Sequence, residues 1–205
     1  MHIGIDFDNT LVDYSDVFTH YAKRLTETPD AVLTDKNALK TLLQSKKDGN
    51  THWTKLQCIV YGEGIVNAKF ATGAMQFLIA CRRKNIPVSI ISHKTKTCAE
   101  GKYHDIRKPA YEFLIRNHFH TKTGISPNAV FFEETRRDKL LRIKRLHCTH
   151  FIDDLIDVFE EIAFPKSVAK ILYATTSSAN NRDVLHFTSW KDIQNYFFRQ
   201  KNYGD

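Results

Sequence analysis

The chain has 205 residues, 42% of them hydrophobic, and carries a formal net charge of +7 at pH 7. That length suits one packed domain with a modest insertion and is too short for two full domains. No apolar run approaches the roughly 20 residues that span a bilayer, and the first expected strand begins at His2, which leaves no room for a signal peptide. We therefore expect a cytoplasmic protein with no membrane attachment.

The positive net charge favours an anionic ligand, but it does not choose among phosphometabolites, nucleic acid and an acidic protein partner. The four cysteines lack the C-x-x-C spacing of a zinc or redox site. Because thiols stay reduced in the cytoplasm, we expect four reduced thiols, at Cys58, Cys81, Cys98 and Cys148.

Short apolar runs rich in β-branched and aromatic residues recur along the chain and predict strands. They lie at His2–Asp6, Val88–Ser92, Ala129–Glu133, His150–Asp153 and Lys170–Ala174. Near-continuous apolar runs of this kind suit strands buried on both faces, and the segments between them have helical periodicity. The alternation predicts an α/β fold with a parallel sheet. A last helix is expected at Trp190–Arg199, packed on the sheet.

The first crossover is unusually long, because about 60 residues separate Asp8 from the helix expected to begin near Gly73, against a usual minimum of about a dozen. Helical patterns occur within it at Val17–Leu25 and Ala38–Leu43. We expect residues 14–70 to form a small, mostly helical cap over the strand ends, and residues 1–13 and 71–205 to form the α/β core.

Acidic residues stand where two of the expected strands end. Asp6 and Asp8 close the first run, and Asp153 and Asp154 close the fourth, with Asp157 one turn later. Ligands of open parallel sheets bind at the carboxyl ends of the strands, so these carboxylates are candidate site residues. Each of them taken alone could equally be a helix cap or a solvated turn residue. If the strands are neighbours, the crowded carboxylates need a cation, and a site with only oxygen ligands suits Mg²⁺.

The segment Asp6-Phe7-Asp8-Asn9-Thr10 resembles the D-x-D-x-T signature of haloacid-dehalogenase-like phosphatases. Ser92 matches the hydroxyl residue that ends the second strand of that family, and Asp153-Asp154 matches its acidic final motif. The resemblance implies a Rossmann-like, doubly wound parallel sheet in which the first strand is central. Asn9 stands where the family often has glycine, and asparagine tolerates the left-handed backbone angles that such a loop needs.

The same resemblance implies a two-step displacement on a phosphomonoester. Asp6 is the expected nucleophile, and Asp8 is the expected group that protonates the leaving oxygen and then deprotonates water. Ser92 is expected to hydrogen-bond a phosphoryl oxygen. Asp6, the main-chain carbonyl of Asp8, and Asp153 are the expected ligands of Mg²⁺. Asp154 and Asp157 both fit variants of the final motif, so which of them supports the ion through water stays open.

A cation should stand on the opposite side of the nucleophile and hold the phosphoryl group, and Lys139 and Lys144 are the candidates. The helix after the third run is expected to start near Thr135, with its N-terminal end at the active edge of the sheet. At about 1.5 Å per residue, Lys144 lies roughly 7.5 Å further from that edge. Lys139 also aligns with the inward-facing Ile143 and Leu146. We therefore expect Lys139 to be catalytic, the alternative being a solvated lysine.

The candidates for substrate binding are Thr10 and Ser92 in the matching motifs, with His93 and Lys94 directly after the second predicted strand. His93 begins a basic stretch that runs to Lys108 beside the expected phosphate site. This stretch is either a substrate loop for a larger or doubly anionic phosphate or a solvated basic loop, and the sequence does not decide between them.

The function that these residues indicate is Mg²⁺-dependent hydrolysis of a small phosphorylated metabolite, a phosphosugar or a nucleotide, through an aspartyl-phosphate. One alternative is a phosphatase that processes nucleic-acid ends, although the basic residues of 136–145 spread around their helix rather than forming one stripe. Another is a non-catalytic phosphate-binding or scaffolding module. The sequence leaves the oligomeric state open.

Overall fold

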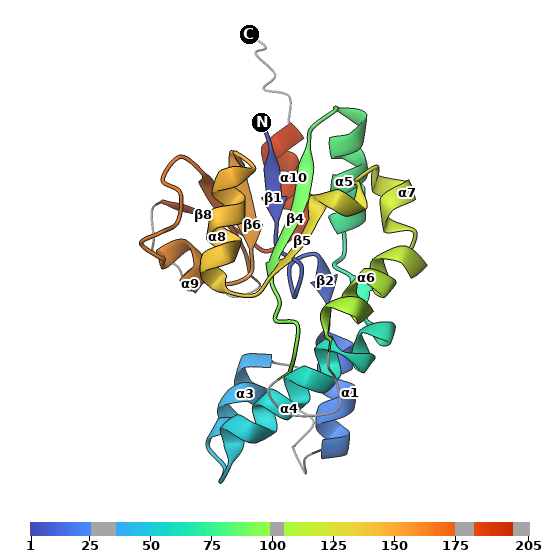
Figure 1. Ribbon diagram of the computed structural model, residues 1–205, viewed down its shortest axis with the longest axis vertical. Coiled ribbons are helices and arrows are strands. Elements are labelled where there is room, and N and C mark those ends of the chain that lie inside the picture. The colour runs from blue at the N-terminus through green and yellow to red at the C-terminus, as the bar shows by residue number, and fades with distance from the viewer. Residues whose placement is uncertain (26–35, 99–104, 175–182, 199–205) are drawn as a thin grey trace.

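The computed structural model describes residues 1–25, 36–98, 105–174 and 183–198. Its centre is a six-stranded sheet of order β5-β4-β1-β6-β7-β8 in which all neighbouring strands are parallel (Figure 1). The strands are β1 (Ile3–Ile5), β4 (Val88–His93), β5 (Val130–Glu133), β6 (His150–Asp153), β7 (Ala169–Tyr173) and β8 (Val184–Phe187). The predicted α/β fold with a parallel sheet and a central first strand is confirmed.

All five predicted strands are present, each within one residue of its expected bounds. The sixth strand, β8, is missing from the sequence prediction. It has four residues, lies at the edge of the sheet beside β7, and buries only Val184. Its apolar run is therefore too short and too mixed to stand out in the sequence.

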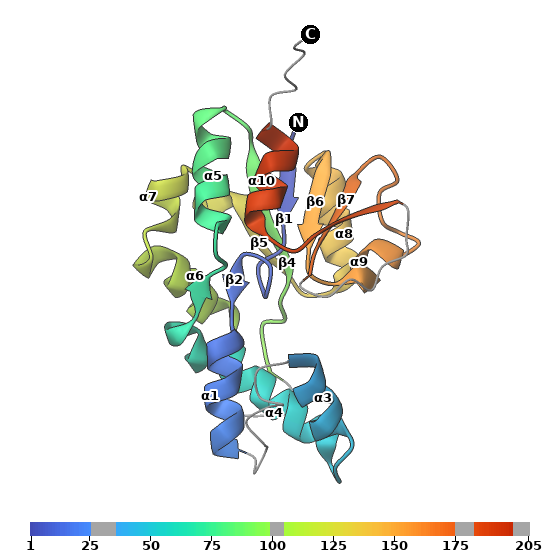
Figure 2. The same ribbon diagram turned by 180° about the vertical axis from the view of Figure 1, so that it is seen from behind.

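Helices cover both faces of the sheet, as a doubly wound fold requires (Figures 1 and 2). The core helices are α5 (Ala74–Arg83), α6 (Arg107–Arg116), α7 (Phe119–Thr123), α8 (Arg136–Arg145), α9 (Ile156–Glu160) and α10 (Trp190–Phe198), with a 3₁₀ turn η2 (Pro127–Ala129). On one face, α8 and α9 bury Ile143 and Phe159 against the sheet. On the other face, α5 and α10 bury Phe77 and Trp190, whose ring centroids are 5.3 Å apart.

The turn after β1 leads the chain out of the sheet and into the insertion. Asn9 in this turn has φ 61°, the left-handed conformation that asparagine adopts more readily than most residues. The next strand, β2 (Val12–Asp13), pairs antiparallel with β3 (Lys69–Phe70). The insertion therefore leaves the core and returns to it at one place.

The insertion contains α1 (Ser15–Leu25), α3 (Lys36–Gln44), α4 (Gly49–Tyr61) and the 3₁₀ helix η1 (Glu63–Asn67), which we together call the cap. The cap lies beyond the carboxyl ends of the strands, away from the N-terminus (Figures 1 and 2). Phe18 of α1 stacks on Trp53 of α4 with ring centroids 5.7 Å apart. α4 is missing from the sequence prediction because its first four residues, Gly-Asn-Thr-His, are weak helix formers. No helix in the described part of the chain has the length and apolar character of a membrane span.

A disulfide bond joins the cap to the core. It links Cys58 of α4 to Cys98 in the segment that follows β4, and the two Cα atoms are 5.8 Å apart. The prediction of four reduced thiols is therefore wrong for this pair. The two residues are 40 positions apart in the sequence and meet only because the insertion folds back over the strand ends. Cys81 and Cys148 are buried free thiols.

We expect Cys81 and Cys148 to resist alkylation in the folded protein. Burial raises the pKa of Cys81 to about 12 and that of Cys148 to about 11, so both stay protonated at pH 8, where the thiol is a much weaker nucleophile than the thiolate. Iodoacetamide labelling of the native protein at pH 8, read by mass spectrometry, should leave all four cysteines unmodified. After mild reduction the label should appear first at the half-buried Cys98. Labelling of Cys98 without reduction would contradict the bond to Cys58.

Candidate active site

Two neighbouring strands bring carboxylates to the same edge of the sheet. Ile5 of β1 is in register with Ile152 of β6, so the next residues along the chain, Asp6 and Asp153, lie side by side. The Asp6 N–H donates a hydrogen bond to the Ile152 carbonyl at 2.9 Å, which fixes the path of the chain as it leaves β1. Both carboxylates are almost completely buried.

Lys139 lies between these two carboxylates. Its Nζ is 2.6 Å from Asp6 Oδ1 and 2.6 Å from Asp153 Oδ2, and its side chain is buried. Thr135 caps α8 by accepting a hydrogen bond from the Asp138 N–H, so the first turns of the helix lie at the edge where the carboxylates emerge. Burial alone would lower the pKa of Lys139, but the charges of Asp153 and Asp6 outweigh it and raise the pKa, so the ammonium stays charged.

Asp154 adds a third carboxylate. One oxygen each from Asp6, Asp153 and Asp154 lies within 4.8 Å of the other two, and we call these three residues the carboxylate cluster. Burial raises the pKa of Asp6 to about 6 against the lowering effect of Lys139, and Asp153 adds to the rise. Burial, together with the charges of Asp153 and Asp6, also raises the pKa of Asp154. A cation that enters between these groups would relieve their repulsion.

The carboxylate cluster fits a divalent cation. Three ionised carboxylates and the Lys139 ammonium together carry a charge of −2. Lys139 binds Asp6 Oδ1 and Asp153 Oδ2. Asp153 Oδ1 accepts a hydrogen bond from the Leu155 N–H at 3.0 Å, and a carboxylate oxygen that accepts one hydrogen bond keeps a lone pair for an ion. All the donors are carboxylate oxygens, the ligand type that Mg²⁺ prefers in proteins.

The structure separates the two acidic residues that the sequence left open. Asp154 belongs to the carboxylate cluster, whereas Asp157 is exposed on α9. Thr10 supports Asp154, because its buried hydroxyl donates to Asp154 Oδ1 at 3.3 Å. The Thr10 carbonyl accepts from Trp190 Nε1 at 3.1 Å. Thr10 was expected to bind substrate, but its contacts are those of a support for the cluster, and it does not line the cavity described below.

Asp8 is held by a different set of donors. Lys94 Nζ is 3.0 Å from Asp8 Oδ1 and 2.9 Å from Oδ2, and the Tyr14 hydroxyl donates to Oδ1 at 2.7 Å. Lys94 is buried, with its ammonium over the rings of Tyr61 and Phe7. Burial and the nearby Asp8 raise the pKa of Tyr14 well above its usual value, so its hydroxyl keeps the proton that it donates. These contacts fix the direction of the Asp8 side chain, which lies outside the carboxylate cluster.

Ser92 and His93 end β4, the strand that flanks β1 on the side opposite β6. Ser92 is buried at the cavity wall. His93 Nε2 lies 3.1 Å from the Glu134 carbonyl oxygen, and since a carbonyl only accepts, this nitrogen carries the proton. Ser92, His93 and Lys94, which the sequence assigned to substrate binding, thus all line one cavity.

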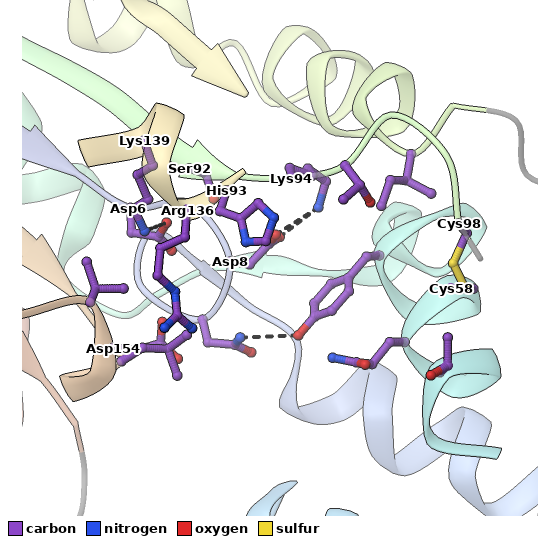
Figure 3. Close-up of a pocket in the computed structure, with 18 of the residues that line it drawn as sticks. Asp6, Asp8, Cys58, Ser92, His93, Lys94, Cys98, Arg136, Lys139 and Asp154 are labelled. Atoms are coloured by element: carbon purple, nitrogen blue, oxygen red, sulfur yellow. Dashed lines mark hydrogen bonds and ion pairs between the residues drawn. A yellow bond between two sulfur atoms is a disulfide. The ribbon is translucent and has the colours of Figure 1, made fainter. Parts of the chain in front are cut away.

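This cavity lies between the strand ends and the cap and has a volume of about 520 Å³ (Figure 3). Its core wall includes Asp6, Asp8, Asn9, Ser92, His93, Lys94, Arg136, Lys139 and Asp154. Its cap wall is formed by Lys36, Lys40, Trp53, Thr54, Gln57, Cys58 and Tyr61. The volume is typical of a site for a small molecule.

The cap wall is the part of the site that sequence reasoning missed. Tyr14 and Tyr61, which surround the Asp8 and Lys94 pair, carry no signal in the sequence that marks them as site residues. Lys36 and Lys40 do carry one, since Lys40 lies in the predicted helix Ala38–Leu43 and Lys36, four residues earlier, shares its face if the helix begins there. The spacing shows that the two lysines share a helix face, but it does not show that this face lies against the cavity.

Comparison of the sequence with protein-family models and with curated proteins finds no match. Solved structures are similar over nearly the whole chain. A predicted phosphatase from Clostridium acetobutylicum is 12% identical with a TM-score of 0.63, covering 97% of this chain and 98% of that one. A haloacid-dehalogenase-like hydrolase from Streptococcus pneumoniae is 15% identical with a TM-score of 0.60, covering 96% and 98%. A HAD family hydrolase from Deinococcus radiodurans is 12% identical with a TM-score of 0.54, covering 96% and 94%.

These similarities extend over both the core and the cap. They agree with the resemblance that the segment from Asp6 to Thr10 indicates in the sequence. The described strand order, with β1 between β4 and β6, is the arrangement that the resemblance implies. This chain has the fold of the haloacid-dehalogenase-like hydrolases.

Proposed function

We propose that this protein is a Mg²⁺-dependent phosphomonoester hydrolase that acts on a small phosphorylated metabolite, a phosphosugar or a nucleotide. The observation that carries the proposal is the buried Asp6 carboxylate, which Lys139 holds at the wall of a cavity beside two further carboxylates. Asp6 and Asp153 would hold the ion, with Asp154 as the third carboxylate and the Asp8 main-chain carbonyl as a further ligand. Bound Mg²⁺ would neutralise charge between the nucleophile and the phosphoryl oxygens.

The chain's own residues account for both steps of the reaction. In the first step, a carboxylate oxygen of Asp6 attacks phosphorus while the bond from phosphorus to the ester oxygen breaks, which gives an aspartyl-phosphate and an alcohol. Asp8 gives the proton that the leaving oxygen needs. In the second step, water attacks the same phosphorus, Asp8 takes its proton, and the bond to Asp6 breaks to release inorganic phosphate. Ser92 would donate a hydrogen bond to a phosphoryl oxygen throughout.

The position of Asp8 supports this assignment. A group that moves protons must keep one orientation towards the reacting oxygen, and Lys94 and Tyr14 hold Asp8 by three contacts of 2.7 to 3.0 Å. Lys139 has the corresponding role for Asp6, because it holds Oδ1 of this cavity-lining residue at 2.6 Å.

The solved structures with this fold add support from outside the chain. The protein from Clostridium acetobutylicum is described as a predicted phosphatase. The structure from Deinococcus radiodurans holds bound phosphate and sodium. Both descriptions concern those proteins, and we extend phosphate chemistry to this chain on the strength of its own carboxylate cluster.

The contacts of the basic residues favour a small substrate over nucleic acid. Two arginines of α8 are paired with acidic partners: Arg136 Nη1 lies 3.1 Å from Glu161 Oε1, and Arg142 Nε lies 2.7 Å from Glu133 Oε1. These two pairings reduce the free charge that α8 offers to a phosphate backbone, while Arg137, Lys144 and Arg145 of the same helix stay exposed. A cytoplasmic location stays a prediction, and the Cys58–Cys98 bond is unusual for that compartment, where thiols are kept reduced.

The first test is hydrolysis of p-nitrophenyl phosphate with Mg²⁺, with EDTA, and by the Asp6→Asn variant. We expect turnover that requires the metal, and a kcat at least about 10³-fold lower for Asp6→Asn, because the amide keeps the size of the side chain but loses its nucleophilic charge. Glu112→Gln, which changes an exposed carboxylate on α6, is the matched control and should keep the wild-type rate. Turnover that survives EDTA or Asp6→Asn would refute the mechanism.

A second prediction concerns the ammonium between the carboxylates. Lys139→Met should lose about 3–5 kcal/mol of unfolding free energy in metal-free buffer at pH 7.5, because it leaves buried carboxylates without their partner. Its kcat should fall by at least about 100-fold. Lys144→Met changes an exposed lysine of the same helix and should stay within about 0.5 kcal/mol of wild type. Urea denaturation measures both, and equal stabilities of the two variants would show that Lys139 does not compensate the cluster.

The pH dependence of metal binding gives a third prediction. Because the pKa of Asp6 is raised to about 6, its carboxyl holds a proton at pH 5, and a protonated carboxyl is a poor ligand. Raising the pH through 6 removes that proton, so Mg²⁺ should bind more tightly at pH 7.5 than at pH 5. The raised pKa of Asp154 acts in the same direction. Isothermal titration calorimetry in buffers of different ionisation enthalpy measures both the Kd and the protons released, and a Kd that does not change with pH would contradict this picture.

A further inference from the structure

The cavity has more cationic side chains than the hydrolysis of a simple phosphomonoester uses. Of the cations on its core wall, Lys139 is bound to Asp6 and Asp153, and Lys94 is bound to Asp8. Arg136 is paired with Glu161. The lysines on the cap wall have no place in the phosphoryl-transfer chemistry described above.

These two lysines are Lys36 and Lys40 of α3, and the packing of the helix sets their direction. Leu39 and Leu43 are buried in the cap, and residues 36, 39, 40 and 43 share one face of a helix that turns by about 100° per residue. Burial of the two leucines therefore holds the two lysines beside them, at the cavity wall. Lys36 and Lys40 are four residues apart, about one helical turn, so their side chains reach the cavity next to each other.

The charge of the cap wall is entirely positive among the described residues. The acidic residues that line the cavity are Asp6, Asp8 and Asp154, and all three stand on the core wall. In the described part of the chain Lys40 is exposed and has no ion-pair partner. Burial alone would lower the pKa of Lys36, but Tyr61 and Asp154 outweigh it and raise the pKa, so its ammonium is charged as well.

The remaining groups of the cap wall suit a small polar ligand. Thr54 and Gln57 offer a hydroxyl and an amide, and the Trp53 ring, stacked on Phe18, offers a rigid apolar surface. A cavity of about 520 Å³ has room for a metabolite that extends from the carboxylate cluster to the cap. Figure 3 shows the catalytic residues at one side of this space and Cys58 of α4 at the other.

We propose that Lys36 and Lys40 form a second anion site, so that the substrate is a phosphomonoester that carries a second anionic group, phosphate or carboxylate, at its far end. The assignment rests on the proposed hydrolase function, because the first phosphoryl group must lie at Asp6. The two lysines could instead serve only to compensate the carboxylates of the core wall. In that case they would affect all phosphate ligands alike, whereas a second anion site discriminates between ligands with and without the far charge.

The test is a binding experiment with phosphonates, which mimic phosphate esters and are not hydrolysed. Isothermal titration calorimetry with Mg²⁺ compares straight-chain alkylphosphonates with α,ω-bisphosphonates and ω-carboxyalkylphosphonates of two to six carbons. At the best chain length we expect a second anion to lower the Kd by roughly 10- to 100-fold, as a charge-assisted contact gives. Comparison of the bisphosphonate with the carboxylate tells which of the two groups the site prefers.

The variants assign that gain to the two lysines. Lys40→Met and Lys36→Met keep the approximate length of the side chain and remove its charge. In each variant the second anion of the ligand should lower the Kd by less than about threefold. Lys47→Met, an exposed lysine of the cap outside the cavity, is the matched control and should keep the full gain. Thermal unfolding of each variant checks that the cap is intact.

Each outcome of this experiment decides the proposal. Equal affinity for ligands with one and two anions, a gain that survives both variants, or no binding of any phosphonate would overturn it. The binding measurement does not depend on turnover. A protein that binds bisphosphonates through Lys36 and Lys40 but hydrolyses no phosphomonoester would therefore refute the hydrolase function and leave the second anion site in place.

Discussion

The contact on which the site depends is the one between the Lys139 ammonium and two buried carboxylates, 133 and 14 positions away along the chain. It forms only if β1 and β6 are neighbours and α8 begins at their carboxyl ends. Breaking such a buried pair costs about 3–5 kcal/mol, a large part of the 5–15 kcal/mol that stabilises a typical domain. Close packing of β1 is a condition for it, because a Cβ on Gly4 would lie 2.6 Å from Cδ2 of Phe151 on β6. Asp6, Lys139 and Asp153 therefore contribute both to the proposed reaction and to the free energy of unfolding of the core.

The core wall and the cap wall of the cavity differ in charge. The core wall holds the carboxylates, and each lysine or arginine there is paired with one or two acidic residues. The cap wall contributes only positive charge among the described residues. The electrostatic potential in the cavity therefore differs between the carboxylate cluster with its ion and the lysines of α3. A ligand whose two ends differ in charge should bind in one orientation rather than the reverse.

Much of the core could be predicted because its signals are local. Apolar runs located five of the six strands, and the residues that end these runs include Asp6 and Asp153. The rise of a helix distinguished Lys139 from Lys144. The rest depends on contacts between distant segments. No local pattern brings Cys58 to Cys98, sets Tyr14 against Asp8, or turns α3 towards the strand ends. Thr10 shows the limit of transferring a motif: its place in the signature is clear, but only the structure shows that its hydroxyl supports Asp154.

The Cys58–Cys98 bond changes how the two parts of the molecule can move. The backbone connects cap and core only through the adjacent strands β2 and β3. A cap attached at this one place could rotate relative to the core about the β2–β3 connection. The disulfide adds a third attachment at the wall of the cavity itself. The bond limits how far α4 can move away from the segment after β4. The distance across the cavity should therefore vary less in the oxidised protein than in the reduced one, where only β2 and β3 connect the cap covalently to the core.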